Sequence, residues 1–158
     1  MVNETIILIA EDDAGHFDLV KRNLWRSCEP KEILRFKDGQ EILDFLFDSG
    51  GPGLMPNTCY VLLLDIRMPK ISGKEVLKRI KSDGQLKVMP VVMLTTTDER
   101  AEIENCYQLG CNVYITKPAD YNEFMDTVQG LGNFLSMGGI KVPVLSRGSV
   151  VRQAAGTA

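Results

Sequence analysis

The sequence predicts an α/β fold, a doubly wound parallel sheet of five strands with five helices packed on its faces. Two observations predict it. Short apolar runs bounded by turn residues alternate with stretches whose apolar residues recur at helical spacing, and this alternation repeats five times. Several of the runs are apolar without a break, which is typical of parallel strands buried on both faces. The length of 158 residues suits one domain with a single core.

The first two strand–helix units lie at the N-terminal end of the chain. Residues 5–10 form an unbroken apolar run that predicts the first strand, and the apolar residues 17, 20 and 24 predict the helix after it. Residues 33–36 predict a short second strand flanked by charge. The apolar positions 42, 45 and 46 predict the second helix.

The third and fourth units follow in the same order. A loop rich in Gly, Pro and Asn precedes an apolar run at residues 60–64, and the apolar positions 76, 77 and 80 predict the third helix. Residues 90–94 predict the fourth strand. Asp98 is the expected N-cap of the fourth helix, and Gly110 is its expected stop.

The fifth unit begins with a strand at residues 113–116. Asp120 and Glu123 form an acidic version of a capping box, which predicts the start of the fifth helix. Gly130 and Gly132 interrupt that helix and weaken the prediction near its end. Five such units in series predict a parallel sheet with helices on both faces.

The C-terminal segment, residues 137–158, differs in composition from the rest of the chain. No Asp or Glu occurs after residue 126, and two short apolar pieces at 142–145 and 150–151 stand among Gly, Ser and Ala. We therefore expect one domain at residues 1–136 and a tail at 137–158. The tail is either partly disordered or an arm that docks on the domain or on a second copy.

Composition excludes several classes of function. A net charge of -3 gives no general attraction to nucleic acid or to an anionic membrane, and no apolar stretch is long enough to span a bilayer. The four cysteines form no CxxC pair, so reduced thiols and a cytoplasmic protein are expected. No signal peptide is expected at the start. No GxGxxG or Walker A pattern occurs, which removes the main support for a nucleotide site.

Polar residues gather where the predicted strands end. Glu11 and Asp12 follow the first strand, Asp65 the third, Thr95 the fourth and Lys117 the fifth. The carboxyl ends of parallel strands share one edge of the sheet, so these side chains are expected to lie together. Three close carboxylates need a counter-charge, and a hard cation such as Mg²⁺ supplies it. Together with a lysine and a hydroxyl, they indicate phosphoryl transfer onto an aspartate.

With these residues at the strand ends, the chain resembles a receiver domain of two-component response regulators, of the kind found in chemotaxis regulators. The resemblance covers roughly residues 5–136 and rests on motifs at four strand ends: Glu11-Asp12-Asp13, Asp65 with Met68-Pro69 and Gly73, Thr95-Thr96, and Tyr114 with Lys117-Pro118. The acid pair and the Lys-Asp-Gly-Gln-Glu segment at 37–41 resemble the single-domain regulators of phytochrome-type histidine kinases. The resemblance implies a flavodoxin-like sheet with strand order 2-1-3-4-5.

The resemblance also implies the chemistry of the acidic residues. Asp65 would accept a phosphoryl group from a histidine on a partner kinase. Glu11, Asp12, Asp65 and the main-chain carbonyl of Arg67 would hold Mg²⁺ or another divalent cation such as Mn²⁺. The protein would then be a phosphoacceptor in signalling, with slow self-dephosphorylation, and not an enzyme.

The same resemblance implies a switch. Lys117 would pair with the phosphoryl oxygens, and its bond to Pro118 would be cis. Thr95 would place its hydroxyl on the phosphoryl group, and Tyr114 would change rotamer with it. The outcome would be a shift of the face formed by the fourth helix, fifth strand and fifth helix.

The implied partners are proteins. They are a sensor histidine kinase of phytochrome type, a downstream phosphotransfer protein, and a second copy of the chain through the switch face. No nucleic acid and no membrane partner is expected. The kinase, the target and the lifetime of the aspartyl phosphate cannot be predicted from the sequence.

Two other functions remain as alternatives. A Mg²⁺-dependent phosphohydrolase with an aspartyl nucleophile usually carries an acid two residues after the nucleophile, where this chain has Arg67. The chain could also be a receiver-like scaffold that is never phosphorylated. Among neighbouring residues, Asp13 is expected to cap the first helix instead of binding metal. His16 is expected at the surface or rim instead of serving as a phosphoryl carrier.

Overall fold

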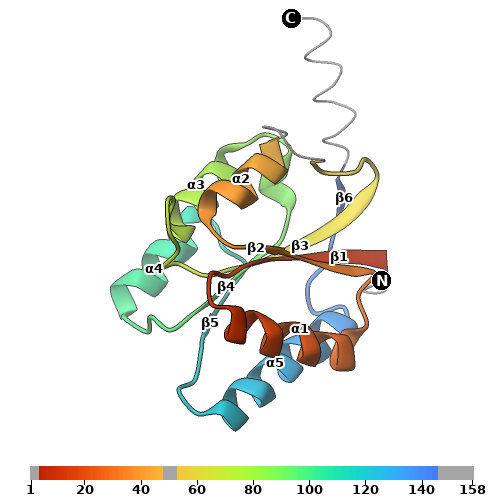
Figure 1. Cartoon of the computed structure of the whole chain (residues 1–158). Helices are drawn as coiled ribbons and strands as arrows, with labels where there is room; N and C mark the ends of the chain where they lie inside the picture. Colours follow the sequence, from red (N-terminus) through yellow and green to blue (C-terminus); the bar gives the residue numbers. More distant parts are fainter. Residues whose placement is uncertain (1–3, 48–52, 146–158) are drawn as a thin grey trace, which may run out of the picture.

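The computed structural model describes residues 4–47 and 53–145 and contains the expected parallel sheet (Figure 1). The strands are β1 (Thr5–Ala10), β2 (Glu32–Phe36), β3 (Thr58–Leu64), β4 (Val91–Thr95) and β5 (Val113–Thr116). They pair in the order β2-β1-β3-β4-β5, and all four of these pairings are parallel. The predicted fold class and strand order are confirmed.

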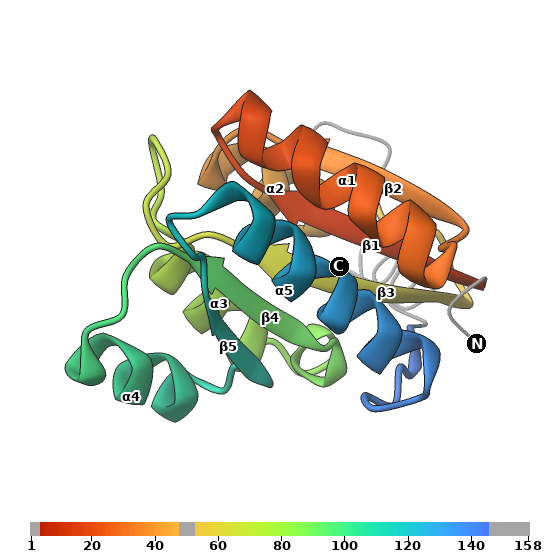
Figure 2. The same cartoon turned by 90° about the horizontal axis from the view of Figure 1, so that it is seen from below.

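Five helices cover the two faces of the sheet. They are α1 (Ala14–Cys28), α2 (Gly39–Phe47), α3 (Gly73–Ser82), α4 (Arg100–Leu109) and α5 (Tyr121–Ser136), and a 3-10 helix, η2 (Leu86–Val88), precedes β4. Helices α1 and α5 lie side by side on one face, whereas α2 and α3 lie on the other, with α4 against α3 (Figures 1 and 2). No helix in the described ranges is both long and apolar enough to cross a bilayer.

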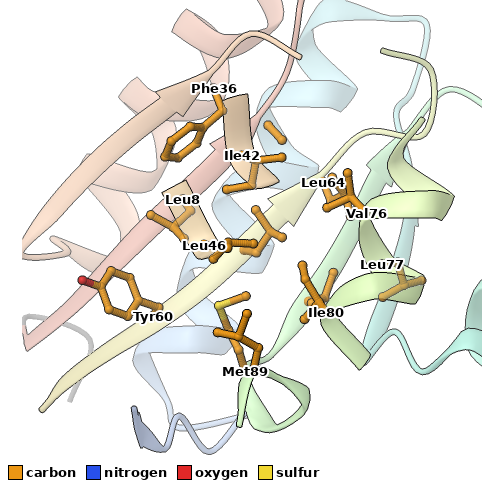
Figure 3. Close-up of a cluster of buried hydrophobic side chains, with 14 of the residues drawn as sticks. Leu8, Phe36, Ile42, Leu46, Tyr60, Leu64, Val76, Leu77, Ile80 and Met89 are labelled. Atoms are coloured by element: carbon orange, nitrogen blue, oxygen red, sulfur yellow. The ribbon is translucent and has the colours of Figure 1, made fainter. Parts of the chain in front are cut away.

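The hydrophobic core forms two layers because neighbouring residues of a strand point to opposite faces of the sheet. In β1, Ile6 and Leu8 join the layer under α2 and α3, whereas Ile7 and Ile9 join the layer under α1 and α5. Figure 3 shows side chains of the first layer, with Tyr60 at one end of it. A sheet buried on both sides explains why the strands carry unbroken apolar runs.

The segment after α5 returns to the sheet. Val144–Leu145 forms a short strand, β6, which pairs antiparallel with Thr58 and Cys59 of β3. It fits there because β4 pairs with β3 only from Leu62 onward, so the start of β3 has a free edge. Residues 146–158, which include the apolar pair at 150–151, lie outside the described residues.

The helix ends follow their caps, with one correction. Asp120 accepts a hydrogen bond from the backbone N–H of Glu123, and Gly110 ends α4 with a φ of 107°. The prediction that Asp98 caps α4 is wrong. The N-cap is Glu99, whose side chain makes no capping hydrogen bond, because the turn after β4 is one residue longer than expected.

Helix α5 runs through both of its glycines. A Cβ atom added at Gly132 would lie 1.8 Å from Oγ of Ser27 in α1, so this glycine permits close contact of the two helices. Gly130 faces open space. The expected weakness near these residues is therefore offset by packing of α5 against α1, which propensity alone does not include.

Candidate functional site

The acidic residues that follow β1 and β3 meet at one edge of the sheet. Ala10 pairs with Leu64 in register, so Glu11 and Asp65 directly follow two neighbouring residues. Together with Asp12, they bring three carboxylate oxygens within 4.8 Å of one another. Glu11 and Asp65 are buried, whereas Asp12 is exposed. The expected cluster of carboxylates is thus formed by the register of two central strands.

Lys117 brings a positive charge into this cluster from β5. Its backbone N–H donates to the carbonyl of Thr95 at 2.7 Å, which fixes the end of β5 against β4. Its side chain is 2% exposed and its Nζ donates to Glu11 Oε1 and, at 3.2 Å, to Asp65 Oδ2. The expected cis bond between Lys117 and Pro118 is wrong: the bond is trans, the form that X–Pro bonds favour slightly.

Burial governs the charge state of Glu11. It raises the pKa of the Glu11 carboxyl above its ordinary value, and the hydrogen bond and positive charge of Lys117 oppose that rise. The Asp65 carboxylate raises it further. The second oxygen of Glu11 accepts the backbone N–H of Asp13 at 3.1 Å. The positive charge of Lys117 does not balance three carboxylates, so an added cation near them would be favourable.

Arg35 holds the main chain of the acidic turn and was not expected from the sequence. Its guanidinium donates to the carbonyl oxygens of Glu11 at 3.3 Å and of Asp12 at 3.1 Å, and it lies 5.1 Å from the centre of the Phe17 ring. Arg35 is paired in register with Ile9 on the neighbouring strand. Only the strand order puts it beside the acids, so the sequence pattern alone gave no signal.

Two glycines let the loop after Asp65 fold tightly. A Cβ atom at Gly73 would lie 1.9 Å from the carbonyl oxygen of Asp65, and one at Gly39 would lie 2.0 Å from that of Ile71. The backbone N–H of Gly73 donates to the carbonyl of Ile66 at 2.7 Å. The loop therefore curls back against the end of β3. The side chain of Arg67, within this loop, is exposed.

Thr95 and Tyr114 lie on β4 and β5. The Thr95 hydroxyl is fully buried and has no hydrogen-bond partner among the described residues. Tyr114 is half-buried, its hydroxyl donates to the carbonyl of Thr97 at 2.6 Å, and burial raises its pKa to about 12. Its backbone N–H donates to the hydroxyl of Tyr107 at 3.1 Å. Tyr114 thus connects α4 to the turn that follows Thr95.

The first turn of α1 adds a cap and a histidine. Asp13 is the N-cap of α1 and accepts the backbone N–H of His16 at 2.9 Å, as expected. His16 is partly exposed, yet its Nδ1 lies 3.2 Å from Nζ of Lys117 and 3.9 Å from Oε1 of Glu11. The expectation of a surface or rim residue omitted this contact. Because Asp13 caps α1, residue 16 lies on the first turn of the helix, near the strand ends. The capping position of Asp13 is the sequence signal from which this contact could have been predicted.

The donor set suits a hard divalent cation. Glu11, Asp12 and Asp65 offer only carboxylate oxygens, which Mg²⁺ and Mn²⁺ accept and which softer metals do not select. Lys117 directly follows β5, and the unpartnered hydroxyl of Thr95 lies at the end of β4. These groups are of the types that a divalent cation and a tetrahedral anion require.

Comparison with known proteins gives one family. The family model described as the response regulator receiver domain matches residues 7–129. The response regulator Rcp1 from a Synechocystis species is 34% identical over 129 residues, which cover 82% of this chain and 87% of that protein.

Solved structures agree with that comparison. A response regulator receiver domain from Rhodospirillum rubrum has a TM-score of 0.82 and 38% identity, covering 89% of this chain and 99% of that one. The Mn²⁺-bound form of Rcp1 has a TM-score of 0.78 and 32% identity, covering 87% and 98%. The phosphorylated cyanobacterial phytochrome response regulator RcpA has a TM-score of 0.78 and 34% identity, covering 87% and 97%.

Proposed function

This chain belongs to the response regulator receiver domain family, and on that premise we propose that Asp65 accepts a phosphoryl group from a partner histidine kinase. The observation that carries the proposal is the arrangement around Asp65. A buried carboxylate stands with two further acids and a buried ammonium, and the neighbouring strand β4 ends in a buried hydroxyl without a partner. Three clustered acids and a buried hydroxyl without a partner both cost free energy in a site that binds no ligand.

The transfer step uses groups that follow or end the strands at the same edge of the sheet as Asp65. A carboxylate oxygen of Asp65 attacks the phosphorus of a phosphohistidine, a P–O bond forms and the P–N bond breaks. The electron pair returns to the imidazole ring, which leaves neutral because its other nitrogen carries a proton. Lys117 and the hydroxyl of Thr95 are the donors for the charge on the phosphoryl oxygens.

A divalent cation completes the proposed site. Glu11, Asp12 and Asp65 would hold Mg²⁺ or Mn²⁺, together with the main-chain carbonyl of Arg67. The Mn²⁺-bound form of the similar protein Rcp1 supports this choice of cation. When bound, the cation offsets the negative charge that the acids and the phosphoryl group share.

The output would be a change of the face formed by α4, β5 and α5. Tyr114 supports this proposal because its hydroxyl bonds to the carbonyl of Thr97, two residues beyond Thr95. A movement of the Thr95 hydroxyl toward a phosphoryl group would shift this turn and release Tyr114. A partner that binds one arrangement of the face better than the other would then report phosphorylation.

We propose a kinase of the phytochrome type, because RcpA is a phytochrome response regulator and the match with this chain covers 97% of RcpA. A downstream phosphotransfer protein and a second copy of the chain, bound through the α4, β5 and α5 face, are the other proposed partners. Sedimentation with and without phosphorylation tests the dimer, and a monomer at high concentration in both states contradicts it. The four cysteines carry no disulfide, which supports a cytoplasmic location.

Acetyl phosphate tests the acceptor reaction without a kinase. We expect the intact protein to gain the mass of one phosphoryl group when Mg²⁺ is present and not when it is chelated. Asp65→Asn should gain none. A slow return to the starting mass is expected, because exposed Arg67 stands where a phosphohydrolase has its acid. Sustained turnover of a phosphomonoester would favour the hydrolase alternative instead, and no mass gain would favour the scaffold.

A panel of purified histidine kinases tests the phytochrome link separately. The initial rate of transfer to the wild type should be highest with a phytochrome-type kinase, and no kinase should label Asp65→Asn. A phytochrome-type kinase that is no faster than unrelated kinases contradicts the link but leaves the acceptor role intact.

A further inference from the structure

We propose that His16 is a positioning residue for Lys117, whose ammonium it holds through Nδ1 while Asp65 is phosphorylated. The inference rests on the proposed function of Asp65. No motif that identifies the site includes His16. Its role follows from the contacts of one nitrogen atom with a buried ammonium.

An ammonium has three N–H donors, and three atoms that can accept them lie near Nζ of Lys117 in the described part of the chain; the His16 nitrogen accepts when its ring carries the proton on Nε2. They are Oε1 of Glu11, Oδ2 of Asp65 at 3.2 Å and Nδ1 of His16 at 3.2 Å. The side chain of Lys117 is 2% exposed, so water does not readily replace a lost acceptor. His16 therefore completes the hydrogen bonding of a buried charge.

The His16 ring is fixed by two helices. Its backbone N–H is held by the cap Asp13 at the start of α1. Its ring lies edge-on to Phe124 of α5, with ring centres 5.5 Å apart and an angle of 75° between the planes. Phe124 is buried in the layer between these helices. The cap that holds the His16 backbone and the contact of its ring with Phe124 together give Nδ1 a defined position from which it can orient a flexible lysine.

His16 differs from the other two acceptors in its charge. Glu11 and Asp65 are carboxylates, and both also belong to the proposed cation and phosphoryl site. A neutral imidazole with its proton on Nε2 accepts the Lys117 N–H at Nδ1 without serving either ligand. When the carboxylates are engaged by a cation or a phosphoryl group, His16 still holds Nζ beside Asp65.

This contact also decides against His16 as a phosphoryl carrier. In the tautomer with its proton on Nε2, Nδ1 of His16 already accepts a hydrogen bond from Lys117. A phosphoryl group on Nδ1 would remove that acceptor and place its charge beside Glu11, 3.9 Å away. The geometry therefore favours a supporting role in transfer to Asp65.

The contact itself can be tested by nitrogen-15 NMR of the imidazole, because His16 is the only histidine in the chain. In the full chain we expect Nδ1 without a proton and Nε2 with one, as a single fixed tautomer. Lys117→Met should give the averaged signals of a free imidazole. A wild-type spectrum with Nδ1 protonated, or one identical to that of Lys117→Met, would overturn the inference. This result does not depend on phosphorylation.

The role in transfer is tested by the initial rate of phosphorylation from acetyl phosphate with Mg²⁺. His16→Leu removes the acceptor and should slow the reaction roughly tenfold, as expected for loss of one hydrogen bond to a buried charge. His16→Asn carries an oxygen near the position of Nδ1 and should recover most of the rate. Circular dichroism and urea unfolding confirm that both variants are folded.

The outcomes separate this inference from the function on which it rests. Equal rates for His16→Leu and the wild type contradict the inference, and so do equally slow Leu and Asn variants, which would indicate a role in packing only. If the wild type gains no phosphoryl group at all, the proposed function fails, while the NMR measurement still decides the contact.

Discussion

At the scale of single residues, two groups of the candidate site, Thr95 and Glu11, are buried in arrangements that lower the free energy of unfolding. The Thr95 hydroxyl is fully buried without a partner, and the Glu11 carboxyl is buried strongly enough that its pKa rises despite Lys117. Both arrangements cost free energy in the unphosphorylated protein. Both would become favourable if the proposed phosphoryl group or cation supplied the missing partner. The cost is therefore located where the proposed ligands bind.

Thr95 gives the first prediction. Thr95→Val keeps the shape of the side chain and removes the unpaired hydroxyl, so the free energy of unfolding should rise by about 1 kcal/mol. The same change should slow phosphorylation by acetyl phosphate about a hundredfold, because one donor to the phosphoryl oxygens is lost. Urea unfolding and intact mass measure the two effects. Thr95→Ser, the control, should retain the phosphorylation rate; a destabilised Thr95→Val would contradict the account.

Cys28 gives a prediction for alkaline pH. Burial raises the pKa of its thiol from about 9.0 to about 11. Between these values the unfolded chain releases the thiol proton and the folded chain keeps it, so the free energy of unfolding falls as pH rises. At pH 10 the loss is about 1 kcal/mol. Cys28→Ala should lose less stability than the wild type between pH 8 and about 10 in urea unfolding. Equal losses would show that the thiol does not contribute.

At the scale of elements, periodicity and turn residues predicted the strands and helices because one face or both faces of each element are buried in the expected pattern. The motifs after β1, β3 and β5 likewise predicted that the acids and Lys117 meet, since the ends of parallel strands share an edge. The contacts of Arg35 and His16 with the site were not predicted, and the reason is physical. Their contacts depend on the strand order and on the rotation of α1, which no local pattern records.

The two glycines of α5 test how that helix is stabilised. Gly130→Ala should raise the free energy of unfolding by about 0.5–1 kcal/mol, because its Cβ enters open space and alanine favours a helix. Gly132→Ala should lower it by about 1–3 kcal/mol, because the Cβ would overlap Ser27 of α1. Chemical denaturation compares the two variants directly. Similar effects at both positions would show that α1 and α5 do not meet closely at Gly132.

At the scale of the whole molecule, the candidate site lies at the carboxyl ends of the strands, and the returning chain lies at the opposite end of β3. The carboxylates lie where β1 and β3 end, whereas β6 pairs with the start of β3. The apolar residues Val142, Val144 and Leu145 of the tail are visible in the sequence. The free edge at Thr58, with which β6 pairs, depends on where β4 starts. That edge could not be predicted from local patterns.

Paired substitutions in β6 test whether the returning strand stabilises the domain. Leu145 is 3% exposed, so Leu145→Ala should lower the free energy of unfolding by about 2–4 kcal/mol. Val144, its neighbour on the same strand, is 58% exposed, and Val144→Ala should change it by less than about 0.5 kcal/mol. Equal, small effects in thermal and urea unfolding would contradict docking of this strand.

The central claim is that Asp65, among the three clustered acids, is the phosphoacceptor. The direct measurement treats the full chain with acetyl phosphate and Mg²⁺, reduces the acyl phosphate with borohydride, and maps the resulting homoserine by peptide mass spectrometry. We expect reduction at Asp65 alone and none in Asp65→Asn. Reduction at Asp12 or Asp13, or none in the wild type, would contradict it.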